Sequence, residues 1–348
     1  MNKKLIIVIF FVMMKIVLVG VDQLYQSKLD ILKNYTKRSD NLFVDQDFKN
    51  IVKDYFFKNP SCLRIIHNKI YCVDNLNHKI VIYSLGGSLI KIFGRSGRGP
   101  GDIYFPLKIV PYKNDIYLSN LNGIEHFDRK LNFKNRIKTF LTFRQFSIFN
   151  DFIYFYTHGY YKDSNPLVIK SNMQGKVVKS YSYTSRKDFP KEYFIGMILS
   201  NKSQFYYFCK HWNRVIIFDS RLKKQKEFAI KYDLLDKLEQ WNDYYWGDHR
   251  KNYSKKGKIW PANIIKSVRF HKGNFYLLLD IPVLQILKVN CQGKLKNIFT
   301  NKEYFKIMRW CDFDVITQNG KIVFYVMGKS LTNDKDNMSD QIIYKVTL

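Results

Sequence analysis

From residue 60 onward, short apolar strands alternate with polar turns, and a three-part pattern recurs. Each copy opens with a polar turn before an aromatic, β-branched strand, continues with a second apolar strand, and ends with a third. The first strand alternates apolar and polar residues with the period of two that half-buried strands show. The six copies begin at Asn68, Asn114, Asn150, Ser203, Gly273 and Asn319.

The turn between the second and third strands has two sequence forms. "SLGGS", "NMQGK" and "NCQGK" supply a glycine where a tight hairpin turn needs positive φ. "DRKLN" and "DSRLK" fill the same slot of the second and fourth copies without a glycine. We therefore expect a different turn in those two copies.

The spacing of the copies predicts the fold. Successive copies start 36 to 70 residues apart, and a period in the forties with three or four strands per unit is typical of a β-propeller. Six sheets packed radially bury each other's faces and leave only short edges. The sequence thus predicts an all-β six-bladed β-propeller over residues 42–348. We expect the last strand, "QIIYKVTL", to close the ring with material near the chain start, such as "SCLRIIHN" at 61–68.

The longest gap between copies contains an insertion, residues 232–263. Leu234, Leu235 and Leu238 have helical spacing, and Asp233 could cap that helix, so the insertion is predicted to be partly helical. Aromatic residues follow, interleaved with charged ones. They form a ligand surface or pin the insertion onto the propeller. The candidates for ligand binding are Trp241, Tyr244, Tyr245, Trp246 and Trp260.

The N-terminus reads as an export signal. Residues 1–20 have a basic start and a long apolar stretch, which is the plan of a signal peptide or, if uncleaved, of an N-terminal anchor. "LVGV" places Val21 where a lipoprotein signal would have the lipidated Cys. Residues 21–41 are predicted to be a linker. We expect an exported protein, periplasmic or at the cell surface.

The stretch "GRSGRGPGD", residues 94–102, is the clearest candidate for a phosphate loop. It lacks the Lys-Ser/Thr pair of a Walker loop, and Pro100 removes an amide that would cradle phosphate. We therefore predict a structural connection between blades. The alternative is an anion nest flanked by Arg95 and Arg98. The structural positions are Gly94, Gly97, Gly99, Pro100 and Gly101.

The repeat and the segment "IFGRSGRGPGDIYFPLKIV" together resemble the six-bladed propeller proteins exported by Bacteroides-type bacteria, relatives of the NHL-repeat propellers. That family often carries Ile-Gly…Gly-x-Gly-Pro-Gly-Glu-Tyr here. Asp102 stands for the Glu, and an extra Ile103 precedes Tyr104. The resemblance covers about residues 42–348. It implies a fold and an export route, not a reaction.

The charge balance bears on partners. Lys+Arg number 58 against 29 Asp+Glu, a formal net charge of +29, but the lysines are scattered without long runs. The excess of basic residues either reflects a bias of the overall amino-acid composition or marks a site that binds a polyanion. Because export separates the protein from nucleic acid, we expect no such partner. An acidic glycan, peptide or protein is the expected partner. We expect contact with a membrane only through residues 1–20, if this segment is not cleaved. The sequence does not predict an oligomeric state.

Catalytic signals are sparse. The seven histidines are scattered without an H-E-x-x-H motif, and no catalytic residue or cofactor is predicted. The resemblance suggests an alternative, because NHL-type lyases of the amidating kind bind zinc through histidines near the central channel. The weak candidates for zinc or calcium are His78, His126 and His211.

Two functions follow from these observations. The first is a non-catalytic exported scaffold that binds a glycan, peptide or protein through one propeller face. The second is a metal-dependent lyase or hydrolase. For the first, we predict that Arg95 and Arg98 share a face with the aromatic insertion and form a basic, aromatic-lined site with it.

Overall fold

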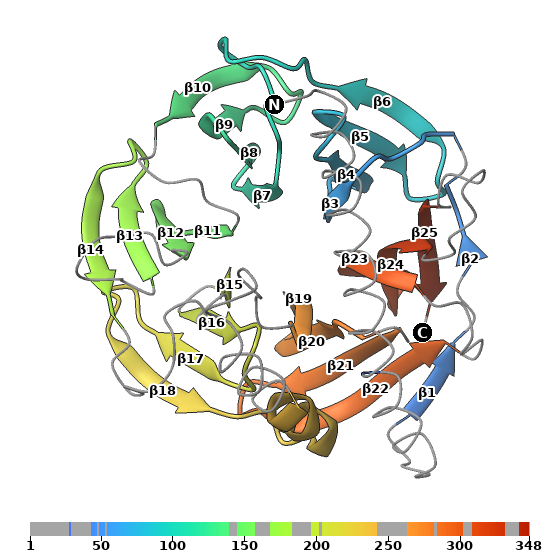
Figure 1. Cartoon of the computed structure of the whole chain (residues 1–348). Coiled ribbons are helices and arrows are strands. Elements are labelled where there is room, and N and C mark those ends of the chain that lie inside the picture. The colour runs from blue at the N-terminus through green and yellow to red at the C-terminus, as the bar shows by residue number, and fades with distance from the viewer. Residues whose placement is uncertain are drawn as a thin grey trace, which may run out of the picture.

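The computed structural model describes residue 28 and residues 43–46, 49–52, 54–138, 145–156, 168–182, 196–201, 204–241, 263–281, 284–301, 308–330 and 341–347. They form six mostly antiparallel sheets arranged around a central axis (Figure 1), and the space between their innermost strands is called the central channel. The predicted all-β, six-bladed propeller is confirmed. Each blade begins at an innermost strand beside the channel and runs outward to the rim.

The strands of the first three blades follow chain order. Blade 1 is made of β3 (Pro60–Ile66), β4 (Lys69–Asp74), β5 (Lys79–Ser84) and β6 (Leu89–Phe93). Blade 2 is made of β7 (Lys108–Tyr112), β8 (Asp115–Asn120), β9 (Gly123–Phe127) and β10 (Phe133–Ile137). Blade 3 is made of β11 (Phe146–Phe149), β12 (Phe152–Tyr156), β13 (Val168–Asn172) and β14 (Val177–Tyr181).

The last three blades repeat this plan, and two of them recruit an N-terminal strand. Blade 4 is made of β15 (Gly196–Ser200), β16 (Phe205–Cys209), β17 (Val215–Phe218) and β18 (Lys224–Phe228). Blade 5 is made of β19 (Ile265–His271), β20 (Asn274–Leu279), β21 (Gln285–Asn290), β22 (Leu295–Asn301) and β1 (Phe43–Gln46). Blade 6 is made of β23 (Met308–Gln318), β24 (Lys321–Ser330), β25 (Gln341–Thr347) and β2 (Lys49–Asn50).

The ring closes through residues other than those expected. The last strand, β25, pairs with β2, which supplies the outermost strand of blade 6. Residues 61–68 do not fill this place, because 61–66 belong to β3, the innermost strand of blade 1, where they pair with β4. The expectation of closure by N-terminal material is correct, and the segment named for it is wrong.

The hairpin turns without glycine match those with glycine, so the expected difference is wrong. Leu131 and Leu222 adopt positive φ, 71° and 62°. The same backbone hydrogen bond closes the turns that open at Asp128 and Asn172. Leu131 N donates to Asp128 O, and Gly175 N donates to Asn172 O, both at 3.0 Å. Leucine therefore takes the left-handed position that glycine fills elsewhere.

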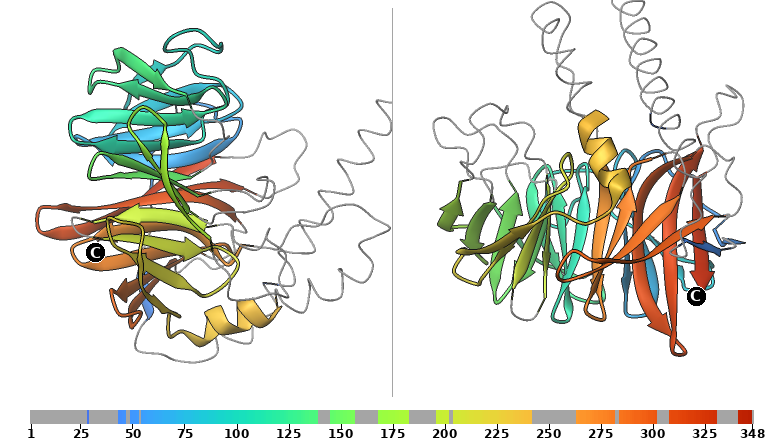
Figure 2. Two further views of the ribbon diagram at one scale, coloured as in Figure 1. Left: turned by 90° about the vertical axis from the view of Figure 1, so that its left-hand side faces the viewer. Right: turned by 90° about the horizontal axis from the view of Figure 1, so that it is seen from below.

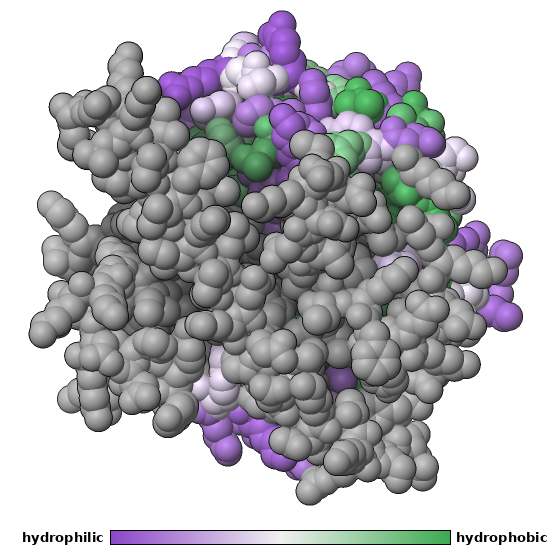
Figure 3. Space-filling model, turned by 45° about the vertical axis from the view of Figure 1, so that its right-hand side comes forward, coloured by the Kyte–Doolittle hydropathy of each residue, from purple (hydrophilic) through white to green (hydrophobic). Residues whose placement is uncertain are grey.

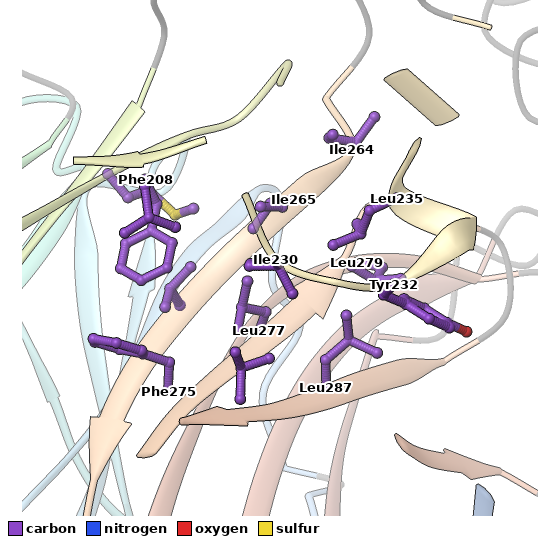
Figure 4. Packing of buried hydrophobic residues seen from close by; sticks show 14 of the residues in the cluster. Phe208, Ile230, Tyr232, Leu235, Ile264, Ile265, Phe275, Leu277, Leu279 and Leu287 are labelled. Atoms are coloured by element: carbon purple, nitrogen blue, oxygen red, sulfur yellow. The ribbon is translucent and has the colours of Figure 1, made fainter. Parts of the chain in front are cut away.

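The insertion begins with the predicted helix, residues 233–241. Leu234, Leu235 and Leu238 are fully buried against blade 5 and join one of the hydrophobic clusters between blades (Figure 4). Burying each leucine contributes about 2 kcal/mol relative to exposure. The helix is therefore held by its apolar face. Among the described residues, no helix is long and apolar enough to cross a membrane.

All connections from one blade to the next leave the same face of the ring. Four antiparallel strands return the chain to the face from which the blade began. We call this the connection face; Figure 2 shows the helix 233–241 projecting from it. The glycine loop joins blades 1 and 2, while the helix follows blade 4. The two therefore stand on opposite sides of the channel (Figure 1).

Candidate functional site

The glycine loop is organised around its own carboxylate. The buried Asp102 side chain accepts hydrogen bonds from Arg95 Nε (2.8 Å) and the Gly99 amide (2.9 Å). The bond from Arg95 holds the pKa of Asp102 below its ordinary value. A Cβ at Gly97 would lie 2.2 Å from Asp102 Oδ2, so this close approach requires a glycine. The Gly99 amide of the alternative anion nest is thus used within the chain.

The loop is also fixed to blade 2. The Arg136 guanidinium donates to the carbonyls of Arg98 (2.8 Å) and Gly99 (2.6 Å). The Arg98 guanidinium lies 5.7 Å from the centre of the Tyr104 ring. Pro100 is exposed in the bend, and Gly94 and Gly101 adopt positive φ, 112° and 75°. The segment connects two blades; ligand binding by Arg95 and Arg98 stays a prediction.

Of the predicted aromatic surface, only Trp241 falls within the described residues, on the helix. Tyr244, Tyr245, Trp246 and Trp260 lie outside them, so the shared site with Arg98 is untested.

The helix meets the predicted linker. The Lys28 ammonium lies 5.8 Å from the centre of the Trp241 ring and donates to Asn263 O (2.8 Å) and Asp280 O (2.7 Å). Burial lowers the pKa of Lys28 to about 8. One residue of the predicted linker is thus anchored on the connection face. The signal segment 1–20 lies outside the described residues.

The three histidine candidates have separate surroundings. His78, in the turn after β4, accepts a hydrogen bond on Nδ1 from the Phe105 amide (3.0 Å), and burial lowers its pKa. His126, on β9, contacts Asp115 Oδ2 through Nε2 at 2.7 Å. His211 is buried in the turn after β16.

These positions do not converge on the channel, because His126 lies on the third strand of its blade, away from the axis. Within the described part of the chain, no group of three or more His, Cys, Asp or Glu side chains is placed to hold a metal ion.

The channel itself contains a site that the sequence did not reveal. The innermost strands enclose two adjoining cavities of about 120 and 270 Å³. Charged side chains from five different blades line them. The cations are Arg64, Lys108, Lys210, Lys266 and Arg269, and the carboxylates are Asp312 and Asp314.

Both carboxylates are engaged by protein groups. Arg269, on β19, donates to Asp312 Oδ2 at 2.7 Å, and its Nε lies 3.3 Å from Asp314 Oδ1. Asp312 Oδ2 also accepts the amide of Leu63 (2.9 Å), and Asp314 Oδ2 accepts the amide of Ile65 (2.8 Å). Arg269 lowers the pKa of Asp312 against the opposing effect of burial. This network joins blades 5, 6 and 1, and Lys266 lies 3.6 Å from Asp280 Oδ1.

Lys108 lies between the two cavities and lines both. Its Nζ donates to the neutral Gln145 Oε1 at 2.8 Å, and no carboxylate of the described residues forms an ion pair with it. Burial in the ring, followed by the nearby Arg269 charge, lowers the pKa of Lys108 to about 7. This ammonium is therefore less stable here than in water.

Neutral polar groups complete the larger cavity. Ser147 Oγ and Ser200 Oγ lie 3.0 Å apart and come from neighbouring innermost strands. The cavity can thus offer hydroxyl groups beside the cations.

A sequence signal for this site does exist. Arg64, Lys108 and Arg269 each lie an even number of residues before the residue that begins the next copy, Asn68, Asn114 and Gly273. Period two then places them on the same side of their strands. The pattern was missed because the strands named in the repeat are the second to fourth of each blade, and the innermost strand precedes them.

Comparisons with known proteins support the fold. No protein-family model and no curated protein matches the chain. A candidate exported protein from Bacteroides fragilis is similar in structure, with TM-score 0.56 and 11% identity over 87% of this chain and 94% of that one. A DUF4221 family member from Bacteroides vulgatus is similar with a TM-score of 0.55 and 12% identity, over 88% of this chain and 97% of that one. Virginiamycin B lyase from Staphylococcus aureus, solved with quinupristin, is similar with a TM-score of 0.52 and 10% identity, over 87% of this chain and 100% of that one.

The chain is therefore a six-bladed β-propeller whose structural neighbours include candidate exported Bacteroides proteins. At these identities the similarity shows the fold alone. The relation to NHL-repeat proteins stays a prediction.

Proposed function

We propose that the protein is an exported, non-catalytic binding propeller that recognises an acidic glycan, peptide or protein through its connection face. The acidic group enters the central channel. One observation carries this proposal: five cations and two carboxylates line the channel, and both carboxylates are already bonded to Arg269 and to β3 amides. The basic and apolar residues 1–20 and the exported Bacteroides neighbours support the location.

Physical chemistry favours an anion there. A channel lined by one sign of charge focuses the electrostatic field and attracts ligands of the opposite sign. Arg64 is suited to pair with a carboxylate, because its Nε makes no hydrogen bond and lies 3.6 Å from Asp314 Oδ2. A metal-dependent lyase or hydrolase has no comparable support, since the described histidines do not come together.

The test uses trigalacturonate as an acidic glycan probe, titrated into the purified protein by calorimetry. Lys108→Gln removes a channel cation and should weaken binding about tenfold, the loss of roughly 1.5 kcal/mol from one charge-assisted hydrogen bond. Lys113→Gln is the matched control, because Lys113 is an exposed lysine of the same blade. It should change the affinity less than twofold.

Equal affinity in the wild type and Lys108→Gln would exclude the channel as the site. Binding that is as strong with neutral galactose oligomers as with trigalacturonate would exclude recognition of the acid.

A further inference from the structure

We propose that Lys108 is a nucleophilic amine that captures a small 2-oxo acid as a reversible imine within the channel. This inference deepens the proposed function, on which it rests, because the same cations would bind the carboxylate of the ligand. A 2-oxo acid has a carbonyl carbon next to a carboxylate, so the amine can react with the first group while a cation binds the second.

The geometry distinguishes Lys108 from the lysines at the surface of its own blade. Lys113 and Lys134 form ion pairs with Asp151 and Asp115, at 2.7 and 2.9 Å. Lys108 instead donates to the neutral side-chain oxygen of Gln145. A structural lysine usually has a carboxylate partner, whereas an amine that reacts must be able to lose its proton. Lys108 has the contacts of the second kind.

The groups around Lys108 favour the neutral amine. Burial is the main cause of the lowered pKa of Lys108, and the charge of Arg269 on β19 comes next. Arg64 of β3 acts in the same direction, whereas Cys62 of β3 and Asp312 of β23 oppose it. An amine next to other cations in a desolvated site is the arrangement in which lysine becomes a nucleophile.

The two arginines near Lys108 differ in how fully the protein uses their hydrogen-bond donors. The Arg269 guanidinium is occupied, since it donates to Ser267 Oγ, Leu63 O and Asp312. Arg64 makes only a loose contact with Asp314, and its side chain is partly exposed to the larger cavity. Arg64 is therefore the residue that would pair with the carboxylate of a 2-oxo acid.

The reaction balances without an oxidant or a further reactant. The lone pair of the neutral Lys108 Nζ forms a bond with the carbonyl carbon, and the carbonyl oxygen takes up the amine proton to give a carbinolamine. The proton that remains on the nitrogen is transferred to that oxygen, water leaves, and a C=N bond remains on Nζ. The Ser147 hydroxyl lines the same cavity and can relay this proton, while Ser200 Oγ donates to Ile148 O (3.2 Å). Water reverses every step, so capture is an equilibrium.

The cavity suits a short acid. Its volume of about 270 Å³ is equivalent to roughly nine water molecules at about 30 Å³ each. A three- or four-carbon 2-oxo acid fits this space beside the Lys108 side chain.

The experiment is reductive trapping. The purified protein is incubated with pyruvate and sodium cyanoborohydride, which reduces an imine to a stable amine, and digested peptides are measured by mass spectrometry. The adduct should form on Lys108 at least about tenfold faster than on Lys113, because only the neutral amine reacts. From pH 6 to pH 8 the rate at Lys108 should rise about tenfold, since the amine loses its proton through about pH 7.

Two variants complete the test. Lys108→Arg keeps the positive charge but cannot form an imine, so it should abolish the adduct. Arg64→Gln should slow trapping of pyruvate and leave trapping of its neutral amide, pyruvamide, unchanged. Equal labelling of Lys108 and Lys113 in the wild type would overturn the inference without any variant.

The outcomes separate the two proposals. If trigalacturonate binds and the Lys108 adduct does not form, the reactive amine is wrong and the anion site stands. If pyruvate and pyruvamide label Lys108 equally and trigalacturonate does not bind, the amine is reactive but the channel does not recognise the acid.

Discussion

At the residue scale, the hairpin turns show how one backbone conformation is reached by two sequences. A leucine at positive φ costs about 1–2 kcal/mol. Leu131 and Leu222 offset this cost by burying their side chains between blades. Asp128 assists, because its Oδ1 accepts the amides of Lys130 and Asn132. The signal shared by these turns is the Ser, Asp or Asn that opens them, rather than the glycine.

Gly175→Ala is expected to be strongly destabilising. Gly175 has φ of 84°, and a Cβ there would lie 2.4 Å from the Lys138 carbonyl oxygen. The strain of a left-handed alanine, about 1 kcal/mol, is therefore joined by a clash with backbone that cannot easily move. We expect the free energy of unfolding to fall by about 2–4 kcal/mol, measured by urea denaturation.

Gly320→Ala is the matched control. Gly320 has a similar φ, 79°, but no atom lies within 4 Å of the added Cβ. It should lose only the strain, about 1 kcal/mol. If the two variants are equally stable, the close approach at Gly175 is relieved by movement of residue 138.

At the element scale, the innermost strands hold the ring together through side chains. Arg269 on β19 contacts the carboxylates of Asp312 and Asp314 on β23, and these accept the amides of β3. The open edge of β3 is thereby satisfied without a neighbouring strand. This link spans three blades at the point where the chain's ends meet.

Arg269→Met is expected to reduce the free energy of unfolding by about 3–5 kcal/mol at pH 7, because it leaves the buried carboxylate of Asp312 without its cation and removes one of the two arginines near Asp314. Burial would then raise the pKa of Asp312, which Arg269 now lowers. Protonation would relieve the variant, so its deficit relative to the wild type should shrink as the pH falls from 7 towards 5. Urea denaturation at both pH values measures this difference.

Arg64→Met provides the comparison. Arg64 is partly exposed and lies 3.6 Å from Asp314, so its removal should cost less than about 1 kcal/mol. An equal loss in both variants would show that shape, rather than charge, sets the contribution of Arg269.

The sequence predicted strands, repeats and the helix because these depend on neighbours in the chain. Period two and the turn residues are local, and so are the helical positions of Leu234 and Leu238. The channel site is not local, since Arg64, Lys108 and Arg269 meet only after six blades have closed. The three histidines likewise differ in place: His78 and His211 lie in turns after the second strands of their blades, and His126 lies on a third strand. Metal binding by them stays a prediction.

At the scale of the whole molecule, the N-terminal segment ties the last two blades to the beginning of the chain. β1 pairs in parallel with β22 in blade 5, and β2 pairs with β25 in blade 6. Upstream, Lys28 donates to the carbonyls of Asn263 and Asp280. The strands "FVDQ" and "KN" are too short to show a period of two in their apolar residues. The sequence therefore indicated that N-terminal residues close the ring, but not which residues pair with the last strand.

Two shortened chains test whether this segment closes the ring. A chain that begins at residue 21 keeps Lys28, β1 and β2, and should unfold at the same urea concentration as the full-length chain. A chain that begins at residue 51 leaves the outer edges of β22 and β25 unpaired. Losing these ladders, at about 1 kcal/mol for each hydrogen bond, should lower the free energy of unfolding by about 3 kcal/mol or more. The bare edges should also promote aggregation, measured by light scattering, because unpaired strands template pairing between molecules. If the two chains unfold together and remain monodisperse, β1 and β2 lie on the rim without closing the ring, and the contacts of Arg269 with Asp312 and Asp314 provide the closure instead.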